Sequence, residues 1–304
     1  MIVRSCAILL LAIIALCAAC DNNANAPQKA VDKMVATDEN ASADVRIKEL
    51  LMGYWNNYDF SDTASANIAD GEQRFSNFLM LLNYADATVA RDAIARFIES
   101  GYAKTELRNR YGALISHYLE NPQSPMRNDA LYLLFLECEL RCIAPDSEAA
   151  RKRIEFKMNV VSKNLPGTIA PDFTYSDRMG NTATLHDIQA PLTLIIFNDP
   201  DCENCKEILP KLKREPMFNR PEVKVLMLYP DEDVQNWMTK GDSLPAGWID
   251  ACNPGGVISN EQLYYIQAMP SLYLLDKNKR VILKDAHPKA VMLAIGDLLN
   301  KNKM

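Results

Sequence analysis

Two cysteines three positions apart, Cys202 and Cys205, are the residues of this 304-residue chain whose types and spacing best suit covalent chemistry. They come after a short apolar run rich in β-branched residues, 192–197, which predicts a buried strand, and residues 203–214 predict a helix. The cysteines therefore lie at a helix N-terminus, where unpaired backbone N–H groups stabilise a thiolate. Two thiols at positions i and i+3 of that first turn can form a disulfide by a small movement, which suits thiol–disulfide exchange.

Elements on both sides of the cysteine helix predict the sheet that positions it. The spacing of the apolar residues changes from helical to strand-like after residue 165. We expect a hairpin of 171–175 and 182–185, strands at 192–197, 223–228, 271–276 and 281–283, and a closing helix at 289–300. The stretch 231–264 is expected to be a loop rich in Gly and Pro with one helical piece at 233–239. Together these elements predict a mixed α/β sheet with helices on both faces.

Residues 42–164 have apolar residues at three- and four-residue intervals throughout. Breaking residues separate about six helices and no strand-like alternation is present, so this region predicts an all-α bundle with a core of its own. It contains no nucleophile–base pair, metal-ligand spacing or phosphate loop. Cys138 and Cys142 lie four positions apart on one helix, with Cα atoms ~6 Å apart and Cβ vectors that do not converge. Two small core residues are therefore favoured over a second redox pair.

The first 20 residues carry one positive charge, Arg4, and then an apolar run too short to span a bilayer, which predicts a signal peptide. Its end, Leu16-Cys17-Ala18-Ala19-Cys20, resembles the lipobox of bacterial lipoproteins, which implies lipid attachment at Cys20. The polar stretch 21–41 fits a flexible tether behind such an anchor. The alternative is a secretory signal cut at an Ala-x-Ala-like site, with Cys20 incidental. The lipoprotein interpretation predicts a protein of the cell envelope of a Gram-negative bacterium, anchored to a membrane and facing the periplasm or the surface.

The sequence thus predicts a signal peptide at 1–20, a tether at 21–41, a helical bundle at 42–164 and an α/β domain at 165–304. The net charge of −6 argues against a nucleic-acid partner. Five of the eight cysteines fall in the folded part, an odd number that cannot pair fully within one molecule. No cofactor and no metal site is expected.

The region 166–304 resembles the thioredoxin fold, specifically the membrane-anchored bacterial thiol–disulfide oxidoreductases. Three features carry the resemblance: Cys202-x-x-Cys205-Lys206 with Pro210 five residues after the second cysteine, Met269-Pro270-Ser271 before an apolar strand, and the opening hairpin 171–185. A lone CxxC is a weak signal, whereas CxxC after a strand with both prolines in place is strong.

The resemblance implies a role for each matching residue. Cys202 is expected to be the attacking thiolate and Cys205 to resolve the mixed disulfide. A cis Pro270 would leave the Met269 carbonyl free to pair with a substrate chain, although an ordinary trans proline at a strand entry is the alternative. The implied partners are protein or small-molecule thiols and disulfides, and the implied direction is reduction or isomerisation, with no redox partner identified.

The sequence departs from the family pattern around the cysteines. Asp201 replaces the aromatic residue before the first cysteine, and Glu203 follows that cysteine. These two carboxylates oppose thiolate formation, while the helix N-terminus favours it by about 0.3 to 1 kcal/mol. Ile196 stands where many thioredoxins have a buried carboxylate, so proton transfer is expected from water or from Asp199, Asp201 or Glu203.

Three other interpretations compete with the oxidoreductase. A peroxidase of the peroxiredoxin type needs a threonine where Asp199 stands. A zinc site has only Cys252 as a third ligand, and that residue is expected to be an inert cysteine rather than a third redox thiol. The last alternative is a redox-inactive thioredoxin-fold scaffold whose helical domain recognises a partner.

Overall fold

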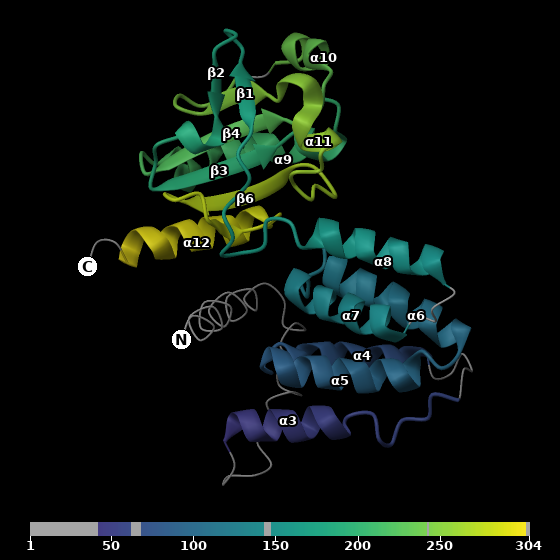
Figure 1. Ribbon diagram of the computed structural model, residues 1–304. Helices are drawn as coiled ribbons and strands as arrows, with labels where there is room; N and C mark the ends of the chain where they lie inside the picture. Colours follow the sequence, from purple (N-terminus) through teal and green to yellow (C-terminus); the bar gives the residue numbers. More distant parts are fainter. Residues whose placement is uncertain (1–41, 62–67, 143–146, 242, 302–304) are drawn as a thin grey trace. The chain divides into compact units, whose positions relative to one another are not determined.

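The computed structural model describes residues 42–61, 68–142, 147–241 and 243–301 (Figure 1). The signal peptide, the lipid-attachment residue Cys20 and the tether predicted from the sequence lie outside these described residues. The chain forms two compact units, Met1–Met158 and Asn159–Met304, and the division falls within the last helix of the first half. No helix in the described ranges is both long and apolar enough to cross a lipid bilayer.

The regular elements described in the first half are all helical, which confirms the predicted all-α region. They are α3 (Ala43–Gly53), α4 (Ile68–Leu82), α5 (Ala87–Gly101), α6 (Thr105–Ile115) with the π-helical turn η2 (Ser116–Glu120), α7 (Asp129–Cys142) and α8 (Glu148–Val161). Their ends follow local chemistry: Asp86 caps α5 by accepting hydrogen bonds from the Thr88 and Val89 N–H groups. The core is aromatic, and Phe97 contacts Phe75 and Tyr111 with ring centroids 5.3 and 5.0 Å apart.

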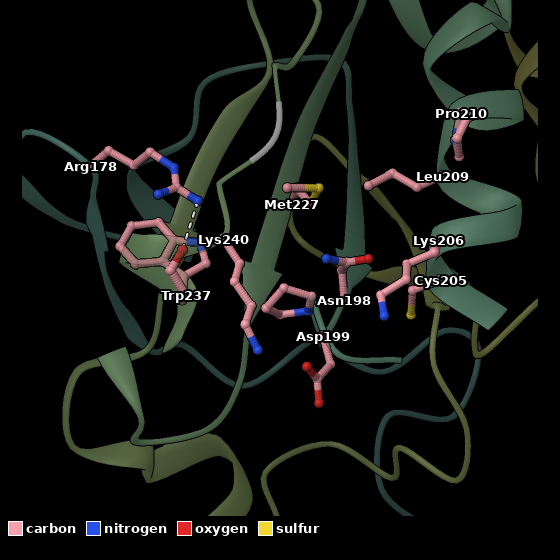
Figure 2. A pocket seen from close by; sticks show the side chains of 11 residues that line it. Arg178, Asn198, Asp199, Cys205, Lys206, Leu209, Pro210, Met227, Trp237 and Lys240 are labelled. Carbon is pink, nitrogen blue, oxygen red and sulfur yellow. Dashed lines mark hydrogen bonds between the residues drawn. The ribbon is translucent and has the colours of Figure 1, made fainter. Parts of the chain in front are cut away.

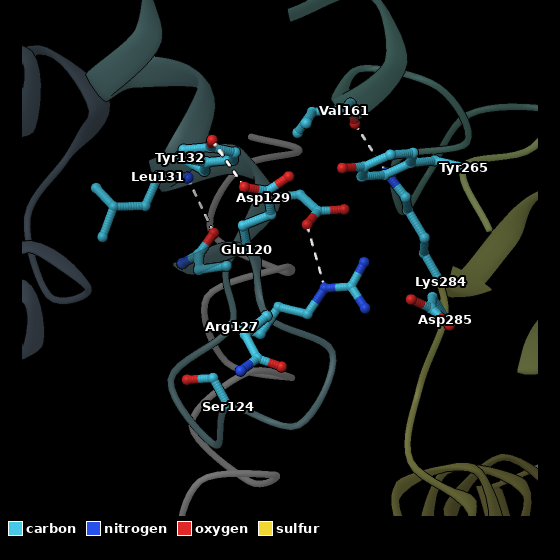
Figure 3. Close-up of polar contacts among 12 residues, drawn as sticks. Glu120, Ser124, Arg127, Asp129, Leu131, Tyr132, Val161, Tyr265, Lys284 and Asp285 are labelled. Atoms are coloured by element: carbon cyan, nitrogen blue, oxygen red, sulfur yellow. Dashed lines mark hydrogen bonds and ion pairs between the residues drawn. The ribbon is translucent and has the colours of Figure 1, made fainter. Parts of the chain in front are cut away.

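Polar contacts fix the end of η2 inside the helical unit (Figure 3). The Tyr132 hydroxyl donates to Glu120 over 2.9 Å. Lys157 also donates to Glu120. Arg127 pairs with Asp129 over 3.3 Å at the start of α7, and both side chains are largely buried. Because the two contacts to Glu120 come from α7 and α8, they tie three consecutive elements together.

The second cysteine pair differs from the expectation of two core residues. Cys138 is buried and its thiol lies 3.7 Å from the Arg91 carbonyl oxygen, but Cys142, at the end of α7, is exposed. Both thiols are free, and burial raises the pKa of each. Cys138 is thus a packing residue, while the expectation of a core position was wrong for Cys142.

The second unit is built on one seven-stranded mixed sheet with the order β2-β1-β5-β4-β3-β6-β7 (Figure 1). The strands are β1 (Thr174–Asp177), β2 (Thr182–Thr184), β3 (Leu192–Phe197), β4 (Val223–Tyr229), β5 (Ile249–Cys252), β6 (Ser271–Asp276) and β7 (Val281–Leu283). The helices are α9 (Glu203–Arg214), α10 (Val234–Thr239), α11 (Val257–Asn260) and α12 (Pro288–Lys301), with short 3₁₀ turns η3 (Leu185–Asp187), η4 (Pro216–Asn219) and η5 (Pro254–Gly256). β3 pairs with β4 in parallel and with β6 antiparallel, so the strand that leads to the cysteines is central.

Both faces of the sheet are covered, as the sequence predicted. Alternate residues of β3, such as Leu194 and Ile196, pack with Leu212 of α9 and Ile295 of α12 on one face. The residues between them face the opposite layer; their cluster includes Ile258 of α11, Phe173, Tyr264, Ile195 and Phe197. The fully buried β3 explains why its sequence is a continuous apolar run rather than an alternating one.

Strand β5 and helix α11 were not predicted, because both lie in the stretch expected to be a loop. β5 has four residues and pairs on both sides, with Leu226 opposite Ile249 in parallel and Ser176 opposite Cys252 antiparallel. This strand joins the opening hairpin to the rest of the sheet. A strand this short between Gly- and Pro-containing segments carries little period-2 signal of its own.

Candidate active site

The turn between β3 and α9 places the first cysteine. The Cys202 N–H donates to the Asp199 carbonyl over 3.2 Å, and the Asp201 N–H donates to the Asp199 carboxylate over 2.8 Å. Cys202 is the N-cap of α9, and its sulfur accepts a hydrogen bond from the Cys205 N–H over 3.2 Å. Asp199 therefore shapes the turn, and the helix directs one of its unpaired N–H groups to the half-buried Cys202 sulfur.

The second thiol lies in a different environment. Cys205 is 1% exposed, and burial raises its pKa to about 12. The nearby Asp199 N–H lowers this pKa in part, while the Cys202 thiol raises it. Both thiols are free. The pair therefore combines a solvent-accessible sulfur with a shielded one that stays protonated at neutral pH.

The loop before β6 faces the same sulfur. Phe197 at the end of β3 pairs with Ser271 at the start of β6, which brings Met269 and Pro270 beside the cysteine turn. The Met269–Pro270 peptide bond is cis, as expected. The Met269 carbonyl oxygen lies 3.4 Å from the Cys202 sulfur and 2.9 Å from the side-chain nitrogen of Asn204. Asn204 was not among the expected site residues, although its position between the two cysteines is a signal for it.

The two carboxylates beside Cys202 each have a lysine partner. Asp201 accepts hydrogen bonds from Lys240 and from Asn236, the latter over 2.7 Å, and these bonds hold its pKa below the usual range. Glu203 pairs with Lys206 over 2.6 Å, which raises the pKa of that lysine. From the sequence, both carboxylates were expected to be uncompensated charges that oppose the thiolate, whereas in the structure each is engaged by a lysine.

A pocket of about 320 Å³ adjoins the buried thiol (Figure 2). Its lining includes Arg178, Asn198, Cys205, Lys206, Trp237 and Lys240. Arg178 forms one wall: its guanidinium lies 4.3 Å from the ring centroid of Trp237, donates to the Trp237 carbonyl over 3.1 Å and pairs with Asp250. Asn198 and this wall were missed from the sequence, because the residues come from four separate segments of the chain.

The third cysteine of this unit, Cys252, is buried in β5, and burial raises its pKa. Its surroundings match those of an unreactive packing thiol. Within the described ranges, no group of three or more His, Cys, Asp or Glu side chains is placed to hold a metal ion.

Comparison with known proteins finds similarities for both halves of the chain. Residues 38–164 match the family described as "Domain of unknown function (DUF5106)". A thioredoxin-like protein from Bacteroides caccae has a similar structure, with a TM-score of 0.76 and 29% identity over 86% of this chain and 96% of that one. The C-terminal domain of an uncharacterized protein from Bacteroides fragilis is 38% identical over 44% of this chain and 99% of its own, with a TM-score of 0.43. No curated protein matches the sequence.

The sheet order, the cysteine turn and the likeness to the Bacteroides caccae structure agree on the fold. The chain therefore combines a helical region that matches DUF5106 with a domain of the thioredoxin-like fold.

Proposed function

We propose that the second unit is a thiol–disulfide oxidoreductase that works through Cys202 and Cys205 in the reducing or isomerising direction. The observation that carries the proposal is the asymmetry of the pair: Cys202 is accessible at a helix N-cap, and Cys205 is buried one turn further along. Nucleophilic attack needs an exposed sulfur with N–H donors nearby, whereas the resolving thiol must be shielded from other disulfides. The names of structural relatives from Bacteroides, which include thiol-disulfide oxidoreductases, point to the same class.

The reaction has two exchange steps. The Cys202 thiolate attacks a substrate disulfide, so that one sulfur of the substrate leaves as a thiolate and the other becomes bonded to Cys202. Cys205 then loses its proton and attacks the Cys202 sulfur. The second substrate sulfur leaves as a thiolate, and Cys202 and Cys205 are left as a disulfide. The substrate gains two electrons and two protons, and the dithiol loses both.

Three carboxylates near the first cysteine belong to the proposed proton-transfer network: Asp199, Asp201 and Glu203. Asp201 and Glu203 are engaged by Lys240 and Lys206. Asp199 lines the pocket beside Cys205. Met269 is proposed to receive a substrate main-chain N–H on its carbonyl oxygen.

Reduction of insulin disulfides by the purified reduced protein, with dithiothreitol as the electron donor, tests the proposal. Cys202→Ser should abolish turnover, while Cys252→Ser, a change at a buried cysteine outside the pair, should leave turnover within about twofold. Turnover that persists in Cys202→Ser would reject the assignment. A protein inactive in both forms would favour the scaffold interpretation.

We further propose that the protein acts in the cell envelope, attached through a lipid on Cys20 and set off from the membrane by residues 21–41. The support is the lipobox-like sequence before Cys20. Expression in Escherichia coli with radiolabelled palmitate should label the wild-type chain and not Cys20→Ser. Equal labelling of the two chains would contradict the anchor.

A further inference from the structure

The pocket beside Cys205 contains a buried oxygen atom that no described residue pairs with. Asn198 is 8% exposed, and its side-chain oxygen has no hydrogen-bond partner among the described residues. The backbone N–H of Asn198 donates to the Leu228 carbonyl over 3.0 Å, so strand pairing fixes the residue just beyond β3. In Figure 2 the amide oxygen points toward the side of the pocket formed by Cys205 and Lys206. Buried acceptors are nearly always paired, so this one requires an explanation.

The charged groups around the pocket are already engaged. Lys206 of α9 pairs with Glu203, Lys240 after α10 pairs with Asp201, and Arg178 of the hairpin turn pairs with Asp250. The Asp199 carboxylate accepts the Asp201 N–H with one oxygen. The lining therefore offers the Asn198 oxygen as an unfilled acceptor, and none of these cations lacks an anionic partner. A small neutral hydrogen-bond donor fits such a pocket better than an anionic ligand. Water is such a donor, and about 320 Å³ holds several molecules at ~30 Å³ each.

We propose that the Asn198 side-chain oxygen orients a water molecule beside the Cys205 thiol, and that this water takes the Cys205 proton when the mixed disulfide on Cys202 is resolved. The inference rests on the proposed function. The proton leaves the Cys205 sulfur for the water and passes to solvent along the pocket, past the Asp199 carboxylate. The freed electron pair forms the Cys205–Cys202 bond, and the bond from Cys202 to the substrate sulfur breaks.

Two observations support such an acceptor. Cys205 is protonated at neutral pH, since its burial disfavours the thiolate. The position where a carboxylate could do this work, Ile196, is buried in the apolar layer under α9 and α12. Asn198 is thus a positioning residue that acts through water.

The test uses 5,5′-dithiobis(2-nitrobenzoate), which releases one coloured thiolate when Cys202 attacks and a second when Cys205 resolves the mixed disulfide. The full chain is used with its other accessible or N-terminal cysteines replaced by serine: Cys6, Cys17, Cys20 and Cys142. Stopped-flow absorbance measures the two releases separately between pH 6 and 9.5. Asn198→Leu removes the acceptor, Asn198→Asp retains one, and Met227→Leu changes the pocket lining without removing an acceptor.

For Asn198→Leu at pH 7, we expect the rate of the first thiolate release to be within twofold of wild type and the rate of the second release to be at least tenfold lower. The difference from wild type in the second rate should shrink toward pH 9.5, because hydroxide then replaces the oriented water. Asn198→Asp should retain the second release, and Met227→Leu should change neither. A second release that is unaffected in Asn198→Leu, or slowed equally at every pH, overturns the inference. Loss of the first release from the wild type would instead overturn the proposed function.

Discussion

The two thiols of the pair should differ sharply in their reaction with iodoacetamide, and the structure gives the size of the effect. Only the thiolate form of a cysteine reacts. With a pKa of about 12, Cys205 is thiolate in ~10⁻⁴ of molecules at pH 8, against ~10⁻¹ for its ordinary value of 9.0. Folding alone should therefore slow alkylation of Cys205 ~10³-fold, and its 1% exposure should slow it further.

The measurement is a timed exposure of the reduced protein to iodoacetamide at pH 8, followed by unfolding, a second alkylating reagent and peptide mass spectrometry. The same protein in guanidinium chloride gives the unfolded rate for each cysteine. Cys252, which is buried outside the pair, reports any unfolding during the pulse. The reasoning is refuted if folded Cys205 is alkylated within tenfold of its unfolded rate while Cys252 stays protected.

Three further predictions concern stability and substrate contacts. Arg178→Ala should lower the free energy of unfolding of the second unit by about 3 kcal/mol, measured in urea by Trp fluorescence, because it leaves Asp250, whose side chain is 14% exposed, without its ion pair. Arg220→Ala breaks a more exposed pair and should lower the free energy of unfolding much less, so equal losses in the two variants would contradict the burial argument. Asn204→Ala removes a side-chain donor that already occupies the Met269 carbonyl, so KM for a peptide disulfide should fall about two- to tenfold. KM for a small disulfide without N–H groups should stay constant. An unchanged KM for the peptide would show that this carbonyl does not bind substrate. The raised pKa of Cys205 contributes stability that is fully present below pH 9.0 and is lost as the pH rises toward about 12. The free energy of unfolding of Cys205→Ser, measured in urea, should therefore decline less steeply with alkaline pH than that of the wild type. Parallel declines of the two proteins would argue against the raised pKa.

Local chemistry made much of the second unit predictable. The continuous apolar run of β3 followed by two cysteines and a helix fixed the turn, because a buried central strand and an N-cap both leave clear marks on the sequence. The same held for β6. These features depend on neighbours within a few residues. The cis bond before Pro270 was instead expected from the family resemblance and from its spacing to the cysteines, and the structure has it.

Features that depend on distant segments were not predictable in the same way. The pairing of Asp201 with Lys240 joins residues 39 positions apart, so the charge balance at Cys202 could not be read from the CxxC stretch alone. Folding buries the side-chain oxygen of Asn198 where no described residue pairs with it, and the local sequence gives no sign of this. β5 is a strand mainly because β1 and β4 pair with its two sides.

The edges of the sheet have a consequence for how the protein behaves at high concentration. Its outermost strands, β2 and β7, have only three residues each. Edge strands offer unpaired backbone groups to which another polypeptide can add, and very short edges offer few of them. Crowded copies of this domain should therefore resist fibril-like polymerisation.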